Sequence, residues 1–435
     1  MKEFLLLLCL ALSANALPID STKNHIEFPR GNIAFASFFH KMDSLVYTGK
    51  GQVNILQLGG SHIQADVISN RVRTRLAKEY PGRAGSRGFV FPFNAAKTNT
   101  PQSYSSKAFG HFKAEKSVFK NNTTPLGLMG IAITTGDPDA KVKIVLDANS
   151  PIKIWNFNKV RVFGFSKDFS ITPALSLDST TFISSKADKA SESFLFNLPK
   201  RSDSLTLSFV WNDKNKENAF QSKLSSLDSL QKDSLFADSN FFKNHSSFTL
   251  TGILLTDTAS GISYNAIGIN GANVAAYLSL KNLERDLSFL KPDLIILSIG
   301  INDANVSEFD EDLFKSHYDT LITRLKSVTP DVPLIFTTNN DSYLTIKGKK
   351  SSFPNSNGIL AREAFFSLAK KYKAGIWDLY SIMGGYRSIE KWEAEDFARK
   401  DKVHFKNNGY EVLGDLFYQA LIESFKPEND TKGKK

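Results

Sequence analysis

An interrupted pattern of predicted strands and helices is the feature of this sequence that most constrains its fold. A short apolar strand at 53–58 ends at Gly59-Gly60, and an amphipathic helix with basic residues on its outer face is predicted over 63–80. A regular strand–helix alternation resumes only after residue 250. Strand–helix–strand units fold into parallel sheets with right-handed crossovers, so the two separated pieces are expected to share one sheet. The residues between them are then an insert.

The pieces expected to form this α/β domain are residues 17–103 and 251–426. The first also carries an apolar helical pattern near 33–46, and glycines and basic residues at 81–92 indicate a loop. In the second piece, predicted strands and helices alternate. The strands are 262–269, 294–298, 333–337 and 375–379, and the helices lie near 273–289, 311–328, 358–372 and 409–425.

The insert, residues 104–250, is predicted to be an all-β sandwich. Short stretches that alternate between apolar and polar residues, such as 142–146 and 205–211, are separated by turn residues. The Ser-, Asp- and Lys-rich stretch near 213–240 indicates a long solvated loop or a short surface helix. Trp155 and Trp211 are expected in the sandwich core rather than as sugar-stacking platforms.

The N-terminus has the pattern of a secretory signal peptide. A charged start is followed by the apolar run 4–12 and by Ala14-Asn15-Ala16, which predicts cleavage after Ala16. The run is too short for a membrane-spanning helix, and no other stretch approaches the required length of about 20 apolar residues. The cysteine at position 9 is the only one in the chain, so thiol catalysis and cysteine-ligated metals are excluded after cleavage. Export without disulfides is typical of a bacterial periplasm or cell surface.

Charge and composition limit the classes of partner that the protein is expected to bind. The formal net charge is +10, which suits an anionic envelope or a polyanionic glycan. The basic residues are scattered and no recognition helix is apparent, so nucleic acid is the weaker interpretation. The histidines lack ligand-like spacing, so no metal site is expected. Residues 427–435 are polar and lysine-rich, and a disordered tail is predicted there.

Three candidate site segments each follow a predicted strand or lie in a late loop. Ligands in open parallel sheets bind beyond the carboxyl ends of the strands, where Ser61 and Asn302 are expected. Taken alone, Ser61 fits an ordinary helix N-cap, and Asn302 fits either a turn residue or an amide donor. Asp401 precedes His404 by three residues, which allows one loop turn to bring the carboxylate onto imidazole Nδ1–H and leave Nε2 for a serine. Two ordinary polar residues in a solvated loop are the alternative.

Two neighbouring features of the sequence are weaker candidates for a catalytic role. His62 follows Ser61 directly and is expected to shape the helix start rather than to catalyse. The stretch Ala84-Gly85-Ser86-Arg87-Gly88 is close to the Gly-x-Ser-x-Gly pattern of hydrolases. It follows no predicted strand, so it is interpreted as a loop.

The three segments occur in the order found in the SGNH (GDSL-like) hydrolases, which the chain resembles. The matching blocks are Gly59-Gly60-Ser61-His62, Gly300-Ile301-Asn302-Asp303 and Asp401-Lys402-Val403-His404. The resemblance assigns the family's lone-glycine block to Gly271, with Gly268 as the competing position. Two residues depart from the family pattern: Gly60 replaces a frequent aspartate, and Lys406 a frequent threonine.

The resemblance is closer to the peptidoglycan O-acetylesterase branch. It extends to the serine block through Asp66, to Gly85-Ser86-Arg87-Gly88-Phe89, to the β insert after it and to Ser388-Ile389-Glu390-Lys391-Trp392. The implied fold is the flavodoxin-like, three-layer α/β sheet of these hydrolases, with an insert that resembles a carbohydrate-binding module. The implied activity is removal of O-acetyl groups from a polysaccharide, most specifically peptidoglycan, by an exported serine esterase.

The resemblance also implies a role for each site residue. Ser61 is the nucleophile, His404 the general base and acid, and Asp401 orients the imidazole. The oxyanion hole comprises the backbone N–H groups of Ser61 and Gly271 and the side-chain amide of Asn302. No metal or organic cofactor is implied. Three alternatives stay open: a glycan O-acetyltransferase with the same triad, a non-catalytic glycan-binding protein, and a lipase or thioesterase.

Overall fold

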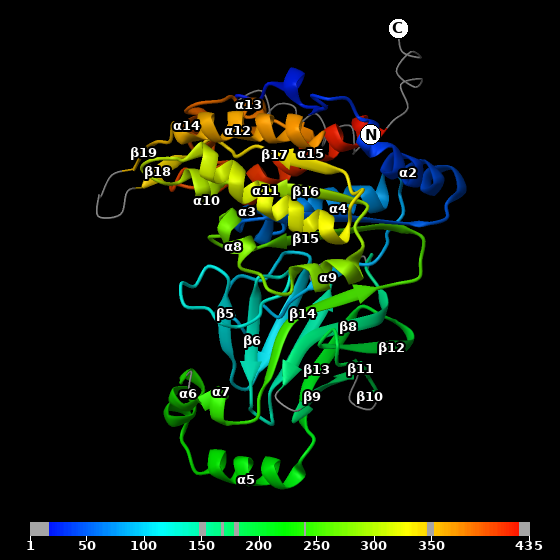
Figure 1. Ribbon diagram of the computed structural model, residues 1–435, viewed down its shortest axis with the longest axis vertical. Coiled ribbons are helices and arrows are strands. Elements are labelled where there is room, and N and C mark those ends of the chain that lie inside the picture. Colours follow the sequence, from blue (N-terminus) through cyan, green and yellow to red (C-terminus); the bar gives the residue numbers. More distant parts are fainter. Residues whose placement is uncertain are drawn as a thin grey trace.

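The structure is a computed structural model that describes residues 17–147, 154–166, 169–177, 182–238, 241–345 and 352–425. The predicted signal peptide 1–16, with Cys9, and the predicted tail 427–435 lie outside these residues. Within the described part of the chain, no helix has both the length and the apolar character needed to cross a membrane. Figure 1 shows two stacked regions, an α/β domain above a β-rich domain.

A six-stranded sheet forms the centre of the α/β domain among the described residues, in the order β1-β20-β17-β16-β2-β15. All neighbouring strands pair in parallel except the edge strand β1. Taken from β15, the five parallel strands follow the 2-1-3-4-5 order of flavodoxin-like sheets. The strands are β1 (Ile26–Glu27), β2 (Gln52–Gly59), β15 (Gly261–Gly268), β16 (Leu294–Ser298), β17 (Leu334–Thr337) and β20 (Gly375–Trp377).

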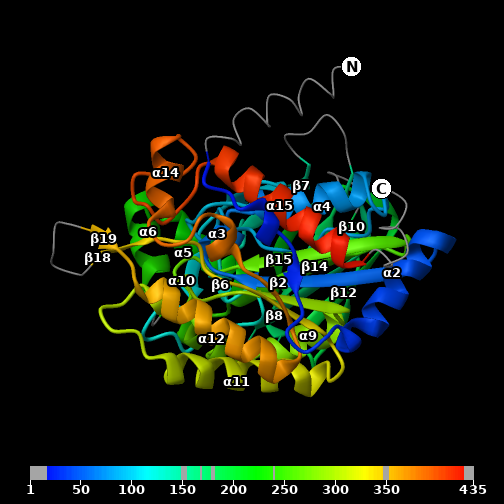
Figure 2. The ribbon, with the colours of Figure 1, turned by 90° about the horizontal axis from the view of Figure 1, so that it is seen from above.

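Helices cover both faces of this sheet, which gives three layers (Figure 2). One face packs against α2 (Ala36–Thr48), α4 (Val67–Lys78) and α15 (Asn407–Phe425), and the other against α9 (Leu283–Leu290), α11 (Glu311–Val328) and α12 (Asn357–Tyr372). Alternate residues of β2 explain the two apolar faces, since Val53 and Ile55 join the first core and Leu56 and Leu58 the second.

Shorter elements complete the α/β domain. They are η1 (Ser21–Lys23), η2 (Ile33–Phe35), α3 (Ser61–Gln64), α8 (Val274–Leu278), α10 (Ile301–Ala304), α13 (Leu379–Ile382) and α14 (Ser388–Ala394), with the hairpin β18 (Tyr343–Thr345) and β19 (Ser352–Pro354).

Two predicted helices are each divided in the structure. The helix predicted over 63–80 becomes α3 and α4, because Asp66 adopts a left-handed conformation with φ of 58°. The helix predicted near 273–289 becomes α8 and α9, and the Arg324 guanidinium donates to the carbonyl oxygens of Leu278 and Leu280 between them. The other predicted strands and helices of the α/β domain agree with the structure to within a few residues.

In the part of the β-rich domain that the structure describes, the strands form two sheets. One has the order β10-β9-β13-β7-β4, and the other β11-β12-β8-β14-β6-β5 with β3 paired to β14. The strands are β3 (Gly88–Val90), β4 (Tyr104–Phe109), β5 (Lys113–Lys116), β6 (Ile131–Thr135), β7 (Lys141–Leu146), β8 (Phe157–Ser166), β9 (Ile171–Ser176), β10 (Phe182–Ile183), β11 (Lys186–Asp188), β12 (Ser193–Ser202), β13 (Ser204–Trp211) and β14 (Phe248–Thr256).

The β sheets extend beyond the predicted limits of 104 and 250. β3 lies in the segment predicted as a loop, and β14 continues to Thr256. A three-residue strand in a glycine-rich stretch shows no alternation, and β14 is buried on both sides, so neither limit was visible in the sequence. The predicted interruption of one α/β domain by a β region is nevertheless what the topology shows.

The polar stretch near 213–240 is helical and partly buried rather than a long loop. α5 (Lys214–Ser225) is capped by Asp213, α6 (Ser229–Ala237) begins with a capping box at Asp228, and α7 (Phe241–Asn244) follows. Phenylalanines of this stretch pack in the domain core. Trp155 and Trp211 are 1% and 4% exposed, which confirms the expectation that they are core residues.

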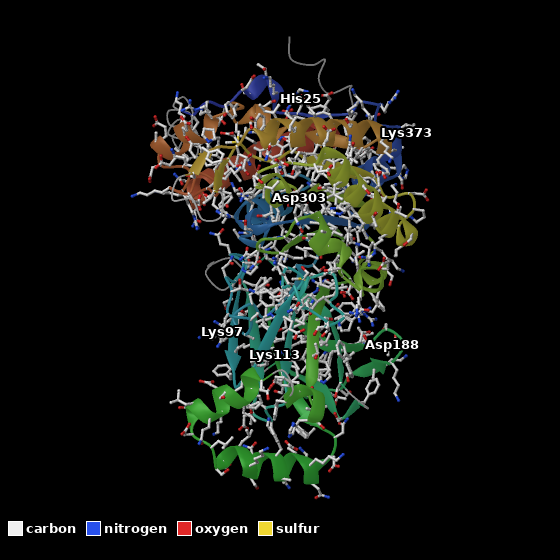
Figure 3. All side chains as sticks on the ribbon, turned by 60° about the vertical axis from the view of Figure 1, so that its left-hand side comes forward. His25, Lys97, Lys113, Asp188, Asp303 and Lys373 are labelled. Atoms are coloured by element: carbon white, nitrogen blue, oxygen red, sulfur yellow. The ribbon has the colours of Figure 1, made fainter. Side chains whose placement is uncertain are left out.

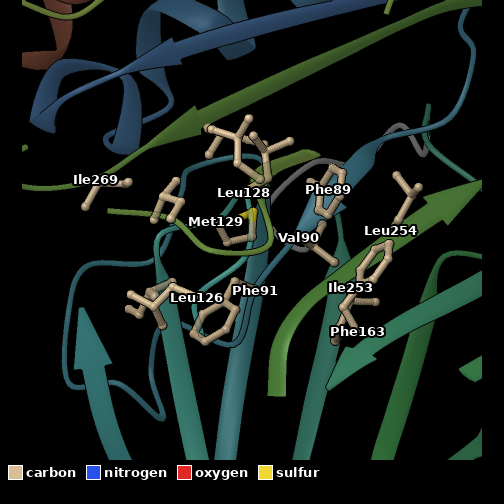
Figure 4. Close-up of a cluster of buried hydrophobic side chains, with 14 of the residues drawn as sticks. Phe89, Val90, Phe91, Leu126, Leu128, Met129, Phe163, Ile253, Leu254 and Ile269 are labelled. Carbon is tan, nitrogen blue, oxygen red and sulfur yellow. The ribbon is translucent and has the colours of Figure 1, made fainter. Parts of the chain in front are cut away.

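An apolar junction joins the two domains without a break. Phe89 and Phe91 from the β3 segment, Met129, and Ile253 of β14 lie in one buried cluster with Ile269, which follows β15 of the α/β sheet (Figure 4). Because this cluster is continuous with the core on one face of the α/β sheet, the two domains bury a common apolar surface.

A buried ionic cluster lies beside this junction. The Asp66 carboxylate pairs with Arg73 of α4 at 2.9 Å and with Arg87 at 3.2 Å, and Ser103 donates a further hydrogen bond. All three ionic groups are about 1% exposed or less. Burial alone would raise the pKa of the Asp66 carboxyl, but the two guanidinium groups outweigh it and the pKa falls to about 2.

Replacement of Asp66 by Asn is expected to destabilise the fold strongly. The substitution leaves two buried guanidinium groups without their counter-charge, a type of change that typically costs about 3–5 kcal/mol. Asp415→Asn is the matched control, since Asp415 also pairs with two arginines of α4 but on the surface, and a loss below about 1 kcal/mol is expected. Urea denaturation of both variants measures this difference. Equal losses would contradict the structural role assigned to the cluster.

Candidate active site

The site lies where the carboxyl ends of three parallel strands meet. In the register of the sheet, Gly59 at the end of β2 is level with Gly268 of β15 and with Ser298 of β16. β2 and β16 are the first and third strands of the 2-1-3-4-5 order. The strand order reverses between them, and the loops after the two strands diverge at this topological switch point. Ser61 follows the first of these strands and Asn302 the second, so the topology brings both residues to one crevice.

The turn that presents Ser61 is tight. A Cβ atom at Gly59 would lie 2.2 Å from Cγ1 of Ile63, so the close approach of strand and helix requires glycine. Ser61 is the first residue of α3, and no side chain caps the helix at Gly60. The first backbone N–H groups of α3 therefore have no helical acceptor and stay available to a ligand.

Ser61, His404 and Asp401 form a hydrogen-bonded chain. Oγ of Ser61 lies 2.9 Å from Nε2 of His404, and Nδ1 of His404 lies 2.9 Å from Oδ2 of Asp401. Because the carboxylate can only accept, Nδ1 carries the proton and Nε2 accepts from the serine hydroxyl. This is the arrangement in which an imidazole can take the serine proton during nucleophilic attack.

The Asp401 carboxylate is held by its own loop. Its Oδ1 accepts from the backbone N–H groups of Val403 and His404, both at 2.9 Å. Burial works to raise the pKa of the Asp401 carboxyl, but these bonds and the His404 side chain outweigh it and the pKa lies below its ordinary value. The carboxylate is therefore ionised at neutral pH and can stabilise a cationic imidazole.

Residues after β17 hold this loop in place, and they were not identified from the sequence. The Asn340 side chain donates to the carbonyl oxygen of Val403 at 3.1 Å. The backbone N–H of Tyr343 donates to the carbonyl oxygen of Lys402 at 2.9 Å. Both residues follow a strand of the parallel sheet. The rule that ligands bind beyond the carboxyl ends of such strands, which identified Ser61, could therefore also have identified the polar residues after Thr337.

Asn302 and Gly271 lie close to Ser61. The Asn302 amide donates to the carbonyl oxygen of Ala272 at 2.8 Å, which leaves its second N–H available. A Cβ at Gly60 would lie 3.4 Å from this amide nitrogen. Gly271 has a left-handed φ of 79°, and a Cβ there would meet no atom within 4 Å, so it faces open space. The competing Gly268 is packed instead, since its Cβ would lie 2.0 Å from the backbone nitrogen of Gln64.

Asp303 holds a neighbouring part of the same region. Figure 3 labels it in the α/β domain, above Lys97 and Lys113. Its carboxylate oxygens both accept from the backbone N–H of Val274 at 3.2 Å, which holds the start of α8 just after the Gly271 turn. Burial raises the pKa of this carboxyl to about 6.

His62 lies partly buried beside the triad. Its Nδ1 lies 2.9 Å from the Tyr410 hydroxyl, and its ring centroid is 5.1 Å from that of His404. Burial, with a smaller contribution from the neighbouring His404, lowers the pKa of His62 to about 3. A second imidazole thus lies next to the catalytic candidate but stays neutral.

The described residues contain no group of three or more His, Cys, Asp or Glu side chains arranged to hold a metal ion. What the site does contain is a hydroxyl, a base in contact with it, an ionised carboxylate behind the base, and amide donors nearby. This set suits acyl transfer through a serine nucleophile.

Comparison with known proteins supports this chemistry. Residues 233–412 match the GDSL-like Lipase/Acylhydrolase family model, a region that includes Asn302, Asp401 and His404 but begins after Ser61. None of the curated proteins gives a significant match. Among solved structures, one described as a peptidoglycan O-acetylesterase in action is 18% identical, and the match covers 89% of this chain and 95% of that chain with a TM-score of 0.66.

Other structures match only part of the chain. An acetyl xylan esterase is 20% identical over 37% of this chain and 81% of its own, with a TM-score of 0.29. A lipase/acylhydrolase from Enterococcus faecalis is 20% identical over 39% of this chain and 80% of its own, with a TM-score of 0.30.

The protein therefore has the SGNH-hydrolase fold with an added β region, and residues 233–412 are similar to the GDSL-like lipases and acylhydrolases. The resemblance in the sequence blocks is confirmed at this level. An esterase or acylhydrolase is the activity that family and fold support.

The neutral state of His62 gives a testable pH dependence. With a pKa of about 3, His62 does not titrate between about pH 4 and pH 7, so it does not contribute to the change of rate in this range. The pH profile of kcat/KM between these limits is therefore expected to have the same slope in the parent protein and in His62→Asn. Steady-state kinetics on a soluble acetate ester measures both profiles. A lower slope in His62→Asn than in the parent protein would contradict the assignment.

Proposed function

We propose that the protein is an exported serine esterase that removes O-acetyl groups from a polysaccharide, with peptidoglycan as the favoured substrate. The observation that carries the proposal is the chain of hydrogen bonds from Ser61 through His404 to Asp401 at the switch point of the sheet. A serine that merely capped a helix would not need an imidazole at 2.9 Å that is itself oriented by a carboxylate.

In the proposed reaction, Ser61 Oγ attacks the acetyl carbonyl carbon while His404 Nε2 takes the serine proton. The Asp401 carboxylate keeps the imidazole oriented and stabilises its cationic form. The carbonyl oxygen becomes an oxyanion, which receives hydrogen bonds from the backbone N–H groups of Ser61 and Gly271 and from the Asn302 amide. Donors of this kind each contribute about 3 kcal/mol to lowering the barrier.

Collapse of the tetrahedral intermediate completes acylation. The bond to the sugar oxygen breaks, and His404 returns its proton to that oxygen, so the deacetylated glycan leaves with a free hydroxyl. Water then attacks the acetyl-serine, with His404 again as base, and acetate is released. Every group required for these steps is on the chain itself.

The preference for peptidoglycan has three supports. The sequence blocks around Ser61 and Asp401 resemble the peptidoglycan O-acetylesterase branch, and the structure of that description matches nearly the whole chain, β region included. The expected export and the net charge of +10 suit an anionic cell-envelope polymer. In this proposal the β region helps to hold the glycan while the ester reaches Ser61.

Acetate release from two polymers tests both the reaction and the substrate. Residues 17–435 are expected to release acetate from O-acetylated peptidoglycan faster than from acetylated xylan, and Ser61→Ala is expected to lose at least about 10³-fold in rate. Ser86→Ala is the matched control, since Ser86 lies in the pattern close to Gly-x-Ser-x-Gly but its hydroxyl lies 3.1 Å from that of Ser263, and the activity of this variant should remain.

The other outcomes separate the alternatives. Release from xylan alone would keep the mechanism and move the substrate to another glycan. Acetyl transfer to a sugar hydroxyl in preference to water would indicate an acetyltransferase. The absence of Ser61-dependent release from either polymer and from a small activated acetate ester would leave the glycan-binding alternative.

A further inference from the structure

The buried side chain of Gln64 connects the serine helix to two segments that lie far away in the sequence. Gln64 is the last residue of α3, three positions after Ser61, and is only 4% exposed. A buried amide carries two donors and one acceptor group that each need a partner. In this position all of its bonds reach residues outside its own helix.

The acceptor of Gln64 binds the turn that holds Gly271. The backbone N–H of Asn270 donates to Gln64 Oε1 at 2.7 Å, one residue before Gly271. On the other side of Gly271, the Asn302 amide binds the carbonyl oxygen of Ala272. The residues on either side of Gly271 are thus each held by a side-chain amide.

The donor side of Gln64 binds the segment that leads into the β region. Gln64 Nε2 lies 3.3 Å from Thr98 Oγ1 and 3.2 Å from Asn99 Oδ1, and the Asn270 side chain donates to the same Asn99 oxygen at 2.7 Å. Asn99 is exposed, whereas Gln64 is not. The three residues form a closed triangle between serine helix, Gly271 turn and β-region entry.

We propose that Gln64 is a positioning residue that sets the Gly271 N–H relative to Ser61, with Asn99 as its anchor. The inference rests on the proposed function, because it presumes that the Gly271 turn binds the oxyanion. Gly271 gains no support from side-chain packing at its own position, since the space beside it is open. The hydrogen bond from Asn270 is therefore the constraint that links this donor directly to the serine helix.

A positioning role differs from a general packing role in the kinetic constant that it affects. The oxyanion exists only in the transition state and the intermediate, so a displaced Gly271 N–H lowers kcat and leaves KM nearly unchanged. Displacements of the order of 1 Å in such groups cost up to about 100-fold in rate.

Gln64→Leu is the principal variant, since it keeps the approximate volume and removes both halves of the amide. The expected result is a fall in kcat of roughly 10- to 100-fold with KM within about threefold. Gln64→Glu keeps an oxygen acceptor for the Asn270 N–H but removes the donor to Asn99, so its kcat is expected to lie between that of Gln64→Leu and that of the parent protein. Asn99→Ala removes only the exposed anchor, and a fall of several-fold in kcat is expected.

Gln57→Leu is the matched control. Gln57 is also buried, at 2% exposure, and its amide also makes hydrogen bonds on both sides, to Ser298 Oγ and from the Tyr264 hydroxyl. It makes no contact with the Gly271 turn. A similar loss of stability but an unchanged kcat is expected for this variant, measured by urea denaturation and by steady-state kinetics on one soluble acetate ester.

The outcomes distinguish this inference from the proposed function. If the parent protein shows no Ser61-dependent esterase activity, the proposed function fails and the inference fails with it. If the parent protein is active and Gln64→Leu matches Gln57→Leu in kcat, the positioning role alone is overturned. Should Gln64→Leu not fold, an unchanged kcat in Asn99→Ala overturns the inference and a selective loss of kcat supports it.

Discussion

The ionic cluster around Asp66 is the interaction on which the geometry of this protein most depends. One carboxylate, buried with two guanidinium groups and a serine hydroxyl, ties the end of the serine helix to α4, to the Arg87 segment and to Ser103. A buried charge with two ionic partners cannot lose one without a large free-energy cost, so these segments move together. Asp66 also takes the left-handed conformation that separates α3 from α4.

The short α3 that results is the basis of the site. Ser61 is its first residue, directly after a glycine turn, and Gln64 is its last, so the proposed nucleophile and the residue that contacts the Gly271 turn share one helical turn. The other residues of the site lie in loops after β16, after β17 and before α15. Because the carboxyl ends of parallel strands lie level, loops that are hundreds of residues apart in the sequence converge on one crevice.

The apolar junction explains how the β region can be inserted without loosening this arrangement. Its core is continuous with that of one face of the α/β sheet, and Asp286 of α9 accepts a hydrogen bond from the backbone N–H of Leu128 across the junction. The segment from Arg87 to Ser103, which connects the α/β domain to the β region, is held by the apolar cluster and by the ionic cluster around Asp66. In the proposed function, a glycan held by the β region would then meet a site of fixed geometry.

Much of this could be predicted from the sequence, for identifiable physical reasons. The parallel strands and long helices follow from apolar periodicity, and Ser61, Asn302, Asp401 and His404 occupy strand ends or a short local spacing. The contacts of Gln64 and Asn340 could not be predicted, since each depends on a partner brought near only by the tertiary fold. The break at Asp66 and the strand β3 were missed because each is decided by contacts beyond the local pattern.

The central claim is that Ser61 forms an acetyl-enzyme, and rapid quenching tests it most directly. The protein is mixed with a small activated acetate ester, quenched in acid within the first turnover, digested and examined by mass spectrometry. The account predicts one added acetyl group on Ser61, which disappears when quenching is delayed until the ester is exhausted. Acetate release without any acetylated Ser61, or acetylation of another side chain in its place, would contradict it.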